Sequence, residues 1–122
     1  MGAVGPQVRP GQTRTNELEQ AVLERIAVDD PALARGLDDL HVLSREYTGA
    51  GSFTNFALLE TALDGAQRHL GWNGLVRLPG VPSGLGAVLF CQGDRPTCLE
   101  LYAFGDEHWD GVHDGFRLEE RG

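Results

Sequence analysis

The segment SREYTGAGSFTNF, residues 44–56, places two full charges inside a run that otherwise has the composition of β-strands. Arg45 and Glu46 are adjacent, and neighbouring side chains of a strand point to opposite faces of a sheet, so they cannot pair with each other. Glu100 is the other isolated charge within an apolar strand pattern. An ion pair between Arg45 and Glu100 across the sheet is therefore a testable hypothesis. Its chemistry would be an arginine that holds an anion beside a carboxylate that acts as a general base.

Polar and aromatic residues on the same strands complete a candidate binding site, which consists of Arg45, Glu46, Tyr47, Asn55, Glu100 and Tyr102. If these side chains converge in a cavity that excludes water, they favour an enzyme or a binder of small anions. If they lie on an open face of the sheet, they are ordinary solvated side chains, because an antiparallel sheet commonly has one face in water. The sequence leaves both interpretations open.

The run GDEHWDGVHDGF, residues 105–116, contains carboxylates and imidazoles that suit a divalent transition metal. Its metal-ligand candidates are Asp106, His108, Asp110 and His113. Glycines interrupt the run, and it has neither the HExxH nor the EF-hand spacing. A solvated acidic loop is the favoured interpretation, and no metal or other cofactor is predicted. A serine-nucleophile elbow and a phosphate-binding loop are also missing from the sequence.

Residues 85–92 and 97–104 have the clearest strand patterns, and the GDRP between them predicts a turn. A four-residue loop at 93–96 would place Cys91 opposite Cys98, with Cβ atoms about 4.5–5.5 Å apart. A disulfide needs about 3.8 Å, so two packed thiols are expected, while a disulfide stays open. The same register predicts one wholly apolar face, made by Val88, Phe90, Leu99 and Leu101.

Two helices are predicted before these strands. Asn16 and Glu19 have the spacing of a capping box, and Asp30-Pro31 has the residue types that begin a second helix. The apolar stripes that follow are Leu18, Val22 and Ile26 in the first helix, and Leu33, Leu37 and Leu40 in the second.

From His41 onward the pattern changes to strands. Residues 41–48 and 52–59 predict a hairpin joined by Gly49-Ala50-Gly51, and residues 73–78 predict a further strand. Residues 60–71 fit either a helix or a loop, and the PGVPSGLG that begins at residue 79 predicts a loop. The expected fold class is α+β, with N-terminal helices packed on one face of an antiparallel sheet of about four to five strands. Residues 1–14 are expected to be a flexible tail, and residues 15–122 a single domain.

Composition narrows the range of partners. The 122 residues include 18 acidic and 10 basic side chains, which gives a net charge of −8. An acidic surface repels phosphate backbones, so nucleic acid is not an expected partner, whereas a basic protein is. No apolar run is long enough to span a membrane, and no apolar signal segment is seen at the start, so the expected location is the cytoplasm.

The chain resembles a group of small bacterial proteins that share an SREYTGxGxFTxF hairpin and a later LExYxxGDxxW segment. Here these motifs are SREYTGAGSFTNF at 44–56 and LELYAFGDEHW at 99–109, with GAVLF at 86–90 between them. The resemblance covers roughly residues 41–109. It implies an α+β fold and no particular chemistry.

Two functions follow from these patterns. The first is a non-enzymatic protein-binding module of an inhibitor or immunity-like kind, indicated by the acidic charge and the lack of a complete catalytic set. The alternative is an enzyme or small-anion binder that uses a pocket on the sheet around Arg45, Glu100 and Tyr102. The oligomeric state and the identity of any partner or ligand are not fixed by the sequence.

Overall fold

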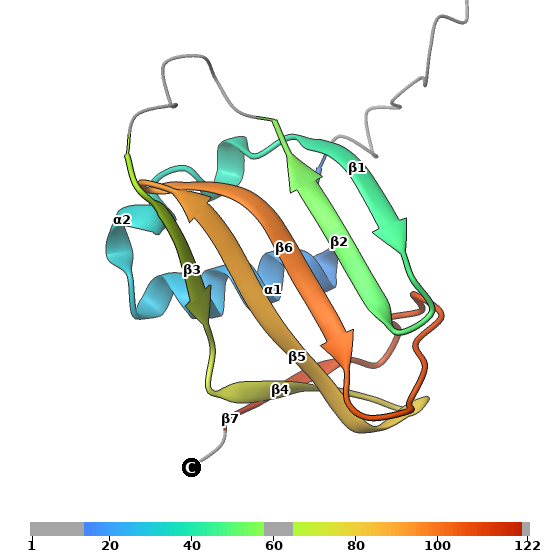
Figure 1. Ribbon diagram of the computed structural model, residues 1–122. Coiled ribbons are helices and arrows are strands. Elements are labelled where there is room, and N and C mark those ends of the chain that lie inside the picture. Colours follow the sequence, from blue (N-terminus) through green and yellow to red (C-terminus); the bar gives the residue numbers. More distant parts are fainter. Residues whose placement is uncertain (1–13, 58–64, 121–122) are drawn as a thin grey trace, which may run out of the picture.

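The computed structural model describes residues 14–57 and 65–120. The expected α+β class is confirmed, with helices on one side of an antiparallel sheet (Figure 1). The described part of the sheet has seven strands, more than the four to five that were expected. The elements in chain order are α1 (Glu17–Val28), α2 (Pro31–Ala34), the 3-10 helix η2 (Leu37–Asp39), β1 (Val42–Tyr47), β2 (Gly51–Phe56), β3 (Gln67–Gly71), β4 (Gly74–Leu78), β5 (Val81–Gln92), β6 (Arg95–Ala103) and β7 (Arg117–Glu120).

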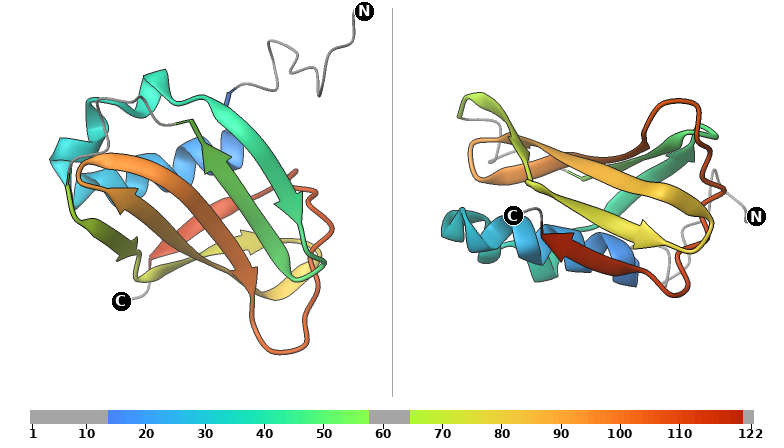
Figure 2. Two further views of the ribbon diagram at one scale, coloured as in Figure 1. Left: turned by 45° about the horizontal axis from the view of Figure 1, so that its top comes forward. Right: turned by 90° about the horizontal axis from the view of Figure 1, so that it is seen from below.

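The strand order is β1-β2-β6-β5-β4-β7, and β3 also pairs with β5. β5 has 12 residues, enough to hold two neighbours on one edge. β4 pairs with its first part, through Val81 and Leu85, and β3 pairs with its last part, from Val88 to Gln92. The sheet bends around α1, so that β7 lies beside the helix in the view from below (Figure 2).

Helix α1 begins as the capping box predicts. The Glu19 backbone N–H donates to Asn16 Oδ1 at 2.8 Å, and the Asn16 N–H donates to Glu19 Oε1 at 2.9 Å. These contacts satisfy backbone donors that have no partner within the first turn of a helix. The buried side of the helix is formed by Leu18, Val22, Leu23, Ile26 and Ala27. Pro31 starts α2 as expected, although the Asp30 side chain does not cap this helix.

The predicted register between β5 and β6 is wrong by two residues beside the turn and by one residue beyond the bulge. Only Gly93 and Asp94 separate the two strands, and a bulge follows between Phe90 and Cys91. Leu89 therefore lies opposite Leu99, and Cys91 lies opposite Pro96. A one-residue slip moves every side chain of a strand to the other face. The apolar inner face is consequently formed by Leu85, Ala87, Leu89, Leu99 and Leu101, all buried.

Two further expectations failed in the second half of the chain. The predicted loop that begins at residue 79 is mostly strand, because β5 starts at Val81 directly after a Pro79-Gly80 turn. Gly84 within it has φ +75° and lies beside the Val76 carbonyl, a backbone position that favours glycine over other residues. Strand β7 was not predicted. Residues 60–71, which fitted helix or loop, contain β3, and residues 58–64 lie outside the described part, as do residues 1–13 of the predicted tail.

Candidate functional site

Arg45 points to the helix-covered inner face of the sheet, where it binds Glu19 of α1. Its Nε and Nη2 donate to the two carboxylate oxygens of Glu19, each at 2.7 Å. Thr54 Oγ1 donates to Oε2 at 2.7 Å, and the Asn16 N–H donates to Oε1. The Glu19 side chain is only 2% exposed, so these four donors replace the water that it loses. Hydrogen bonding to Glu19 raises the pKa of Arg45, although partial burial opposes it.

The predicted ion pair between Arg45 and Glu100 is wrong. Arg45 lies opposite Thr54, which lies opposite Leu99, and all three share the inner face. Glu46 and Glu100 lie on either side of Phe53, on the other face. Arg45 pairs with an acidic residue of the helix, which the pattern of charges within the strands does not show. Arg45 and Glu100 cannot line one pocket, because the sheet separates them.

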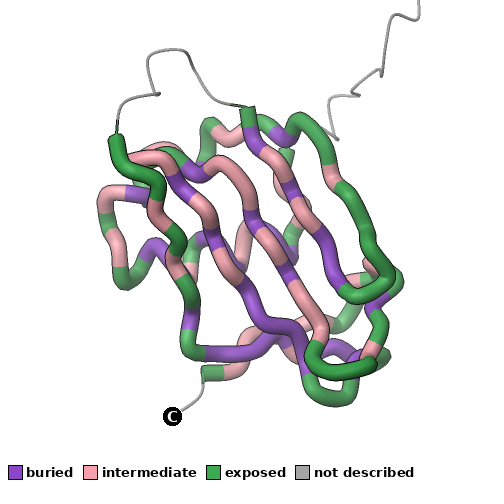
Figure 3. The backbone as a smooth tube through the Cα atoms, viewed as in Figure 1, coloured by how far each residue is buried: buried purple, intermediate pink, exposed green. Residues whose placement is uncertain are grey.

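The face without helices carries most of the other predicted site residues. We call it the outer sheet face and define it by Glu46, Phe53, Asn55, Val88, Phe90, Cys98, Glu100 and Tyr102. Figure 1 looks onto this face, and Figure 3 shows buried and half-buried residues alternating along β2, β5 and β6. Apart from Glu46, which is exposed, every member is half-buried. The described part of the chain has no helix over these strands on this side (Figure 2).

The two glutamates of the outer sheet face are available for binding. Glu46, Phe53, Glu100 and Val88 form one row across four strands. Glu46 accepts one long hydrogen bond, 3.4 Å, from Asn55 Nδ2. The Glu100 carboxylate makes no hydrogen bond or ion pair with any side chain or backbone group of the described ranges. The face as defined contains two carboxylates and no arginine or lysine, while His69 of β3 lies opposite Phe90 at its edge.

The two tyrosines of the predicted site are separated. Tyr102 lies on the outer sheet face over Gly86 and contacts the Phe104 ring edge-on, with the centroids 5.4 Å apart. Tyr47 lies opposite Ser52 on the inner side and contacts Trp109 edge-on at 5.9 Å. Desolvation by burial raises the pKa of Tyr47. Tyr47 therefore supports the packing of the C-terminal loop and is not part of the outer sheet face.

Both cysteines are free, and they point to opposite faces. Cys91 is 2% exposed in the core, and burial raises the pKa of its thiol to about 11. Cys98 is half-buried on the outer sheet face, and burial also raises its pKa. Because the thiolate is the reactive form, neither cysteine is prepared to act as a nucleophile.

The loop between β6 and β7 carries the metal-ligand candidates. Its anchor is Trp109, which is 5% exposed and whose Nε1 donates to the Val112 carbonyl at 2.9 Å. Asp110 Oδ1 accepts from the Val112 N–H at 3.0 Å, and the His113 ring contacts Phe116, with the centroids 6.4 Å apart. Within residues 14–57 and 65–120, no three His, Cys, Asp or Glu side chains converge as metal ligands would, and Asp106 and His108 gain no such neighbours.

A cavity of about 330 Å³ lies between this loop and the β4–β5 turn. We call it the Trp109 cavity; its lining is Leu78, Pro79, Gly80, Val81, His108, Trp109, Asp110, Val112 and Asp114. It includes His108 and Asp110 from the predicted metal set and excludes Asp106 and His113. The sequence indicated these residues as acidic loop positions. The apolar wall was not predictable, because it comes from a turn about 30 residues earlier in the chain.

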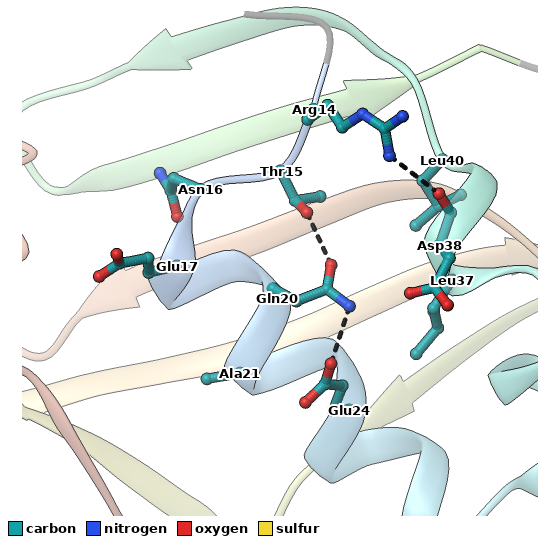
Figure 4. A pocket seen from close by; sticks show the side chains of 10 residues that line it. All are labelled: Arg14, Thr15, Asn16, Glu17, Gln20, Ala21, Glu24, Leu37, Asp38 and Leu40. Atoms are coloured by element: carbon teal, nitrogen blue, oxygen red, sulfur yellow. Dashed lines mark hydrogen bonds between the residues drawn. The ribbon is translucent and has the colours of Figure 1, made fainter. Parts of the chain in front are cut away.

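A larger hollow of about 590 Å³ lies at the start of α1 (Figure 4). Thr15 Oγ1 donates to Gln20 Oε1 at 2.7 Å, and Gln20 Nε2 donates to Glu24 Oε2 at 2.9 Å. Arg14 Nη1 donates to the Asp38 carbonyl at 3.3 Å. Figure 4 shows Gln20 and Glu24 on the helix, Arg14 and Thr15 before it and Asp38 on η2, with groups that bind one another without converging on one point. The hollow offers no arrangement of groups suited to a particular reaction.

No protein-family model, curated protein or solved structure matches this chain. In the part that the structure describes, no helix has the length and apolar character needed to cross a membrane. The outer sheet face and the Trp109 cavity are the two described features whose geometry bears on function.

Proposed function

We propose that this protein is a non-enzymatic binding module whose outer sheet face docks a basic partner protein, as an inhibitor or immunity protein would. The observation that supports this is the row in which Phe53 separates Glu46 from Glu100 on a face without helices. A half-buried aromatic side chain flanked by two carboxylates without a counter-ion is suited to a partner that presents both apolar and cationic groups.

Electrostatics favours the same partner. The chain has a net charge of −8, and the arginine nearest to the face in sequence, Arg45, is held on the opposite side by Glu19. A negative surface accelerates association with a basic protein and repels other acidic chains. We place this binding in the cytoplasm, where free thiols such as Cys91 and Cys98 persist.

The structure does not support the alternative function, an enzyme or small-anion binder, because Arg45 is not on the same face as the other residues of its site. That function required Arg45, Glu100 and Tyr102 in one pocket, and Arg45 lies across the sheet from the other two. The eight residues that define the outer sheet face include no arginine or lysine that could hold an anion beside Glu100 and Tyr102. We therefore do not propose this alternative.

The test is capture of partners by the immobilised full chain from extracts of its own cells, at low and at high salt. The site variant is Glu46→Gln/Glu100→Gln, and Asp38→Asn/Asp39→Asn removes the same charge from exposed residues of η2. We expect a basic protein that binds the wild type and the η2 variant, binds the site variant several-fold more weakly, and dissociates as salt rises. Equal capture by all three chains, or no partner at either salt level, would contradict the proposal.

A further inference from the structure

The Trp109 cavity has the composition of a small-ligand site and shares no residue with the outer sheet face. Its floor is apolar and buried: Leu78, Val81 and Trp109 are 7%, 2% and 5% exposed. Its volume of about 330 Å³ falls within the range of ligand pockets, about 300–1,000 Å³. Such a cavity favours a ligand with an apolar body.

The rim of the cavity determines the charge of that ligand. It carries the carboxylates of Asp110 and Asp114 with His108, and no arginine is among the lining residues. Asp110 uses Oδ1 to accept from the Val112 N–H, which leaves Oδ2 for another donor. Asp114 has no hydrogen bond or ion pair within the described ranges. Two carboxylates above an aromatic floor attract a cation and repel an anion.

The loop that carries this rim is held in place from several sides. Trp109 N–H donates to the Gly49 carbonyl at 3.0 Å, and its indole N–H is already bound by Val112. Gly111 has φ +91° and lies against Tyr47, where an added Cβ would be 2.7 Å from Cε1. A rim that is ordered before binding loses little conformational entropy when a ligand arrives.

From the apolar floor and the acidic rim, we propose that the Trp109 cavity binds a small organic cation, an ammonium or guanidinium group joined to an apolar body. The body lies on Trp109 and Val81, and the cationic head lies between Asp110 and Asp114. The same chemistry is available in a free amine and in an arginine or lysine side chain of another protein, and the experiment distinguishes these two sources.

The experiment is calorimetric titration of the full chain with phenethylammonium and, as its neutral counterpart, 2-phenylethanol. Asp110→Asn/Asp114→Asn keeps the Oδ1 acceptor for Val112 and removes both charges, and Asp38→Asn/Asp39→Asn is the control of equal charge. We expect the amine to bind at least about fivefold more tightly than the alcohol, and the site variant to lose about tenfold or more in amine affinity. The control should bind like the wild type.

Fluorescence locates the binding. The chain has two tryptophans, so Trp72→Phe leaves Trp109 as the only reporter, and the amine should change its emission. If Trp72→Phe does not fold, the location of the binding site is decided by calorimetry alone, from the amine affinities of Asp110→Asn/Asp114→Asn and Asp38→Asn/Asp39→Asn. A capped Ala-Arg-Ala peptide is the second arm: tighter binding than the amine assigns the site to a side chain of a partner, and weaker binding assigns it to a free amine. Equal affinity for amine and alcohol, or no difference between the site variant and the control, would overturn the proposal.

Discussion

Arg45 and Glu46 are neighbours in β1, but they lie on opposite faces of the sheet and differ in burial and in their partners. On the inner face, Arg45 makes two 2.7 Å hydrogen bonds to a buried carboxylate, Glu19. On the outer face, Glu46 is exposed and accepts a single hydrogen bond of 3.4 Å. The inner charge neutralises a buried carboxylate, whereas the outer charge is open to solvent.

A charge within a strand is therefore not by itself a sign of a functional site. Its meaning depends on the partner, and the partner of Arg45 comes from a helix 26 residues away. The same helix makes a second pair at the opposite edge of the sheet, where Arg25 binds Glu120 of β7. The two edge strands, β1 and β7, thus each hold α1 through an arginine and a glutamate.

The largest expected effect is on the inner face. Arg45→Met should lower the free energy of unfolding by about 3–5 kcal/mol, because it leaves the Glu19 carboxylate buried without its counter-ion. Urea unfolding followed by circular dichroism measures the change. Glu46→Gln, one residue along on the outer face, is the matched control and should stay within about 0.5 kcal/mol of the wild type. Equal losses in the two variants would show that the faces do not differ as described.

The cysteines provide a chemical comparison of the same faces. Cys91 has a pKa of about 11 against an ordinary value of 9.0, so its thiolate fraction falls about a hundredfold, and its burial adds a steric barrier. Iodoacetamide should therefore label Cys98 first in the native protein, as followed by peptide mass spectrometry. In denaturant the two rates should become similar. Labelling of Cys91 as fast as Cys98 under native conditions would mean that the inner face opens readily.

A substitution with a smaller expected effect on stability tests the position of the Tyr102 ring on the outer sheet face. An added Cβ at Gly86 would lie 2.7 Å from Tyr102 Cε2, so Gly86→Ala should cost about 1–2 kcal/mol as the ring is displaced. Gly71, at the end of β3, has no atom within 4 Å of such a Cβ. Gly71→Ala should be neutral or slightly stabilising, since glycine is unfavourable in a strand. Thermal unfolding of both variants makes the comparison, and equal melting temperatures would place the ring elsewhere.

Local signals predicted much of the fold. The capping box of α1, the proline that starts α2 and the glycine-assisted hairpin of β1 and β2 depend on residues close in sequence, and the structure has all three. The register of β5 and β6 failed because the turn has two residues where four were assumed, and because a bulge between Phe90 and Cys91 shifts the remaining pairs back by one residue. The strand that starts at Val81 was not recognised because it contains a proline and two glycines; Pro82 is exposed and Gly84 occupies a positive-φ position.

The candidate site was less predictable than the fold. Glu46, Asn55, Glu100 and Tyr102 do share a face, but the sequence could not separate them from Arg45 without the correct register. Glu19 was assigned to its capping box, and nothing local shows that the same carboxylate also binds Arg45. Strand β7, with the sequence RLEE, lacks an apolar alternation because it is a short edge strand whose glutamates form ion pairs with arginines.

The smallest expected effect concerns the ion pair between Arg25 of α1 and Glu120 of β7, which is open to solvent. Arg25 Nε and Nη2 donate to Glu120 at 2.6 and 2.7 Å, yet the two side chains are 25% and 55% exposed. Hydrogen bonding to Arg25 lowers the pKa of Glu120 below its ordinary value of 4.5. A lowered pKa in the folded state stabilises the protein above pH 4.5, and this contribution is lost as the pH falls below that value.

Glu120→Gln removes this titration and keeps an acceptor for the Trp72 indole N–H, which donates to Glu120 at 3.2 Å. The melting temperature of the variant should lie slightly below that of the wild type at neutral pH, and the difference should shrink below pH 4.5. Added salt should shrink it as well, because the pair is screened by water and ions. The effect of Arg45→Met should respond little to salt, because Glu19 is 2% exposed. If added salt changed the stability loss of both variants equally, burial would not distinguish the Arg45–Glu19 ion pair from the Arg25–Glu120 ion pair.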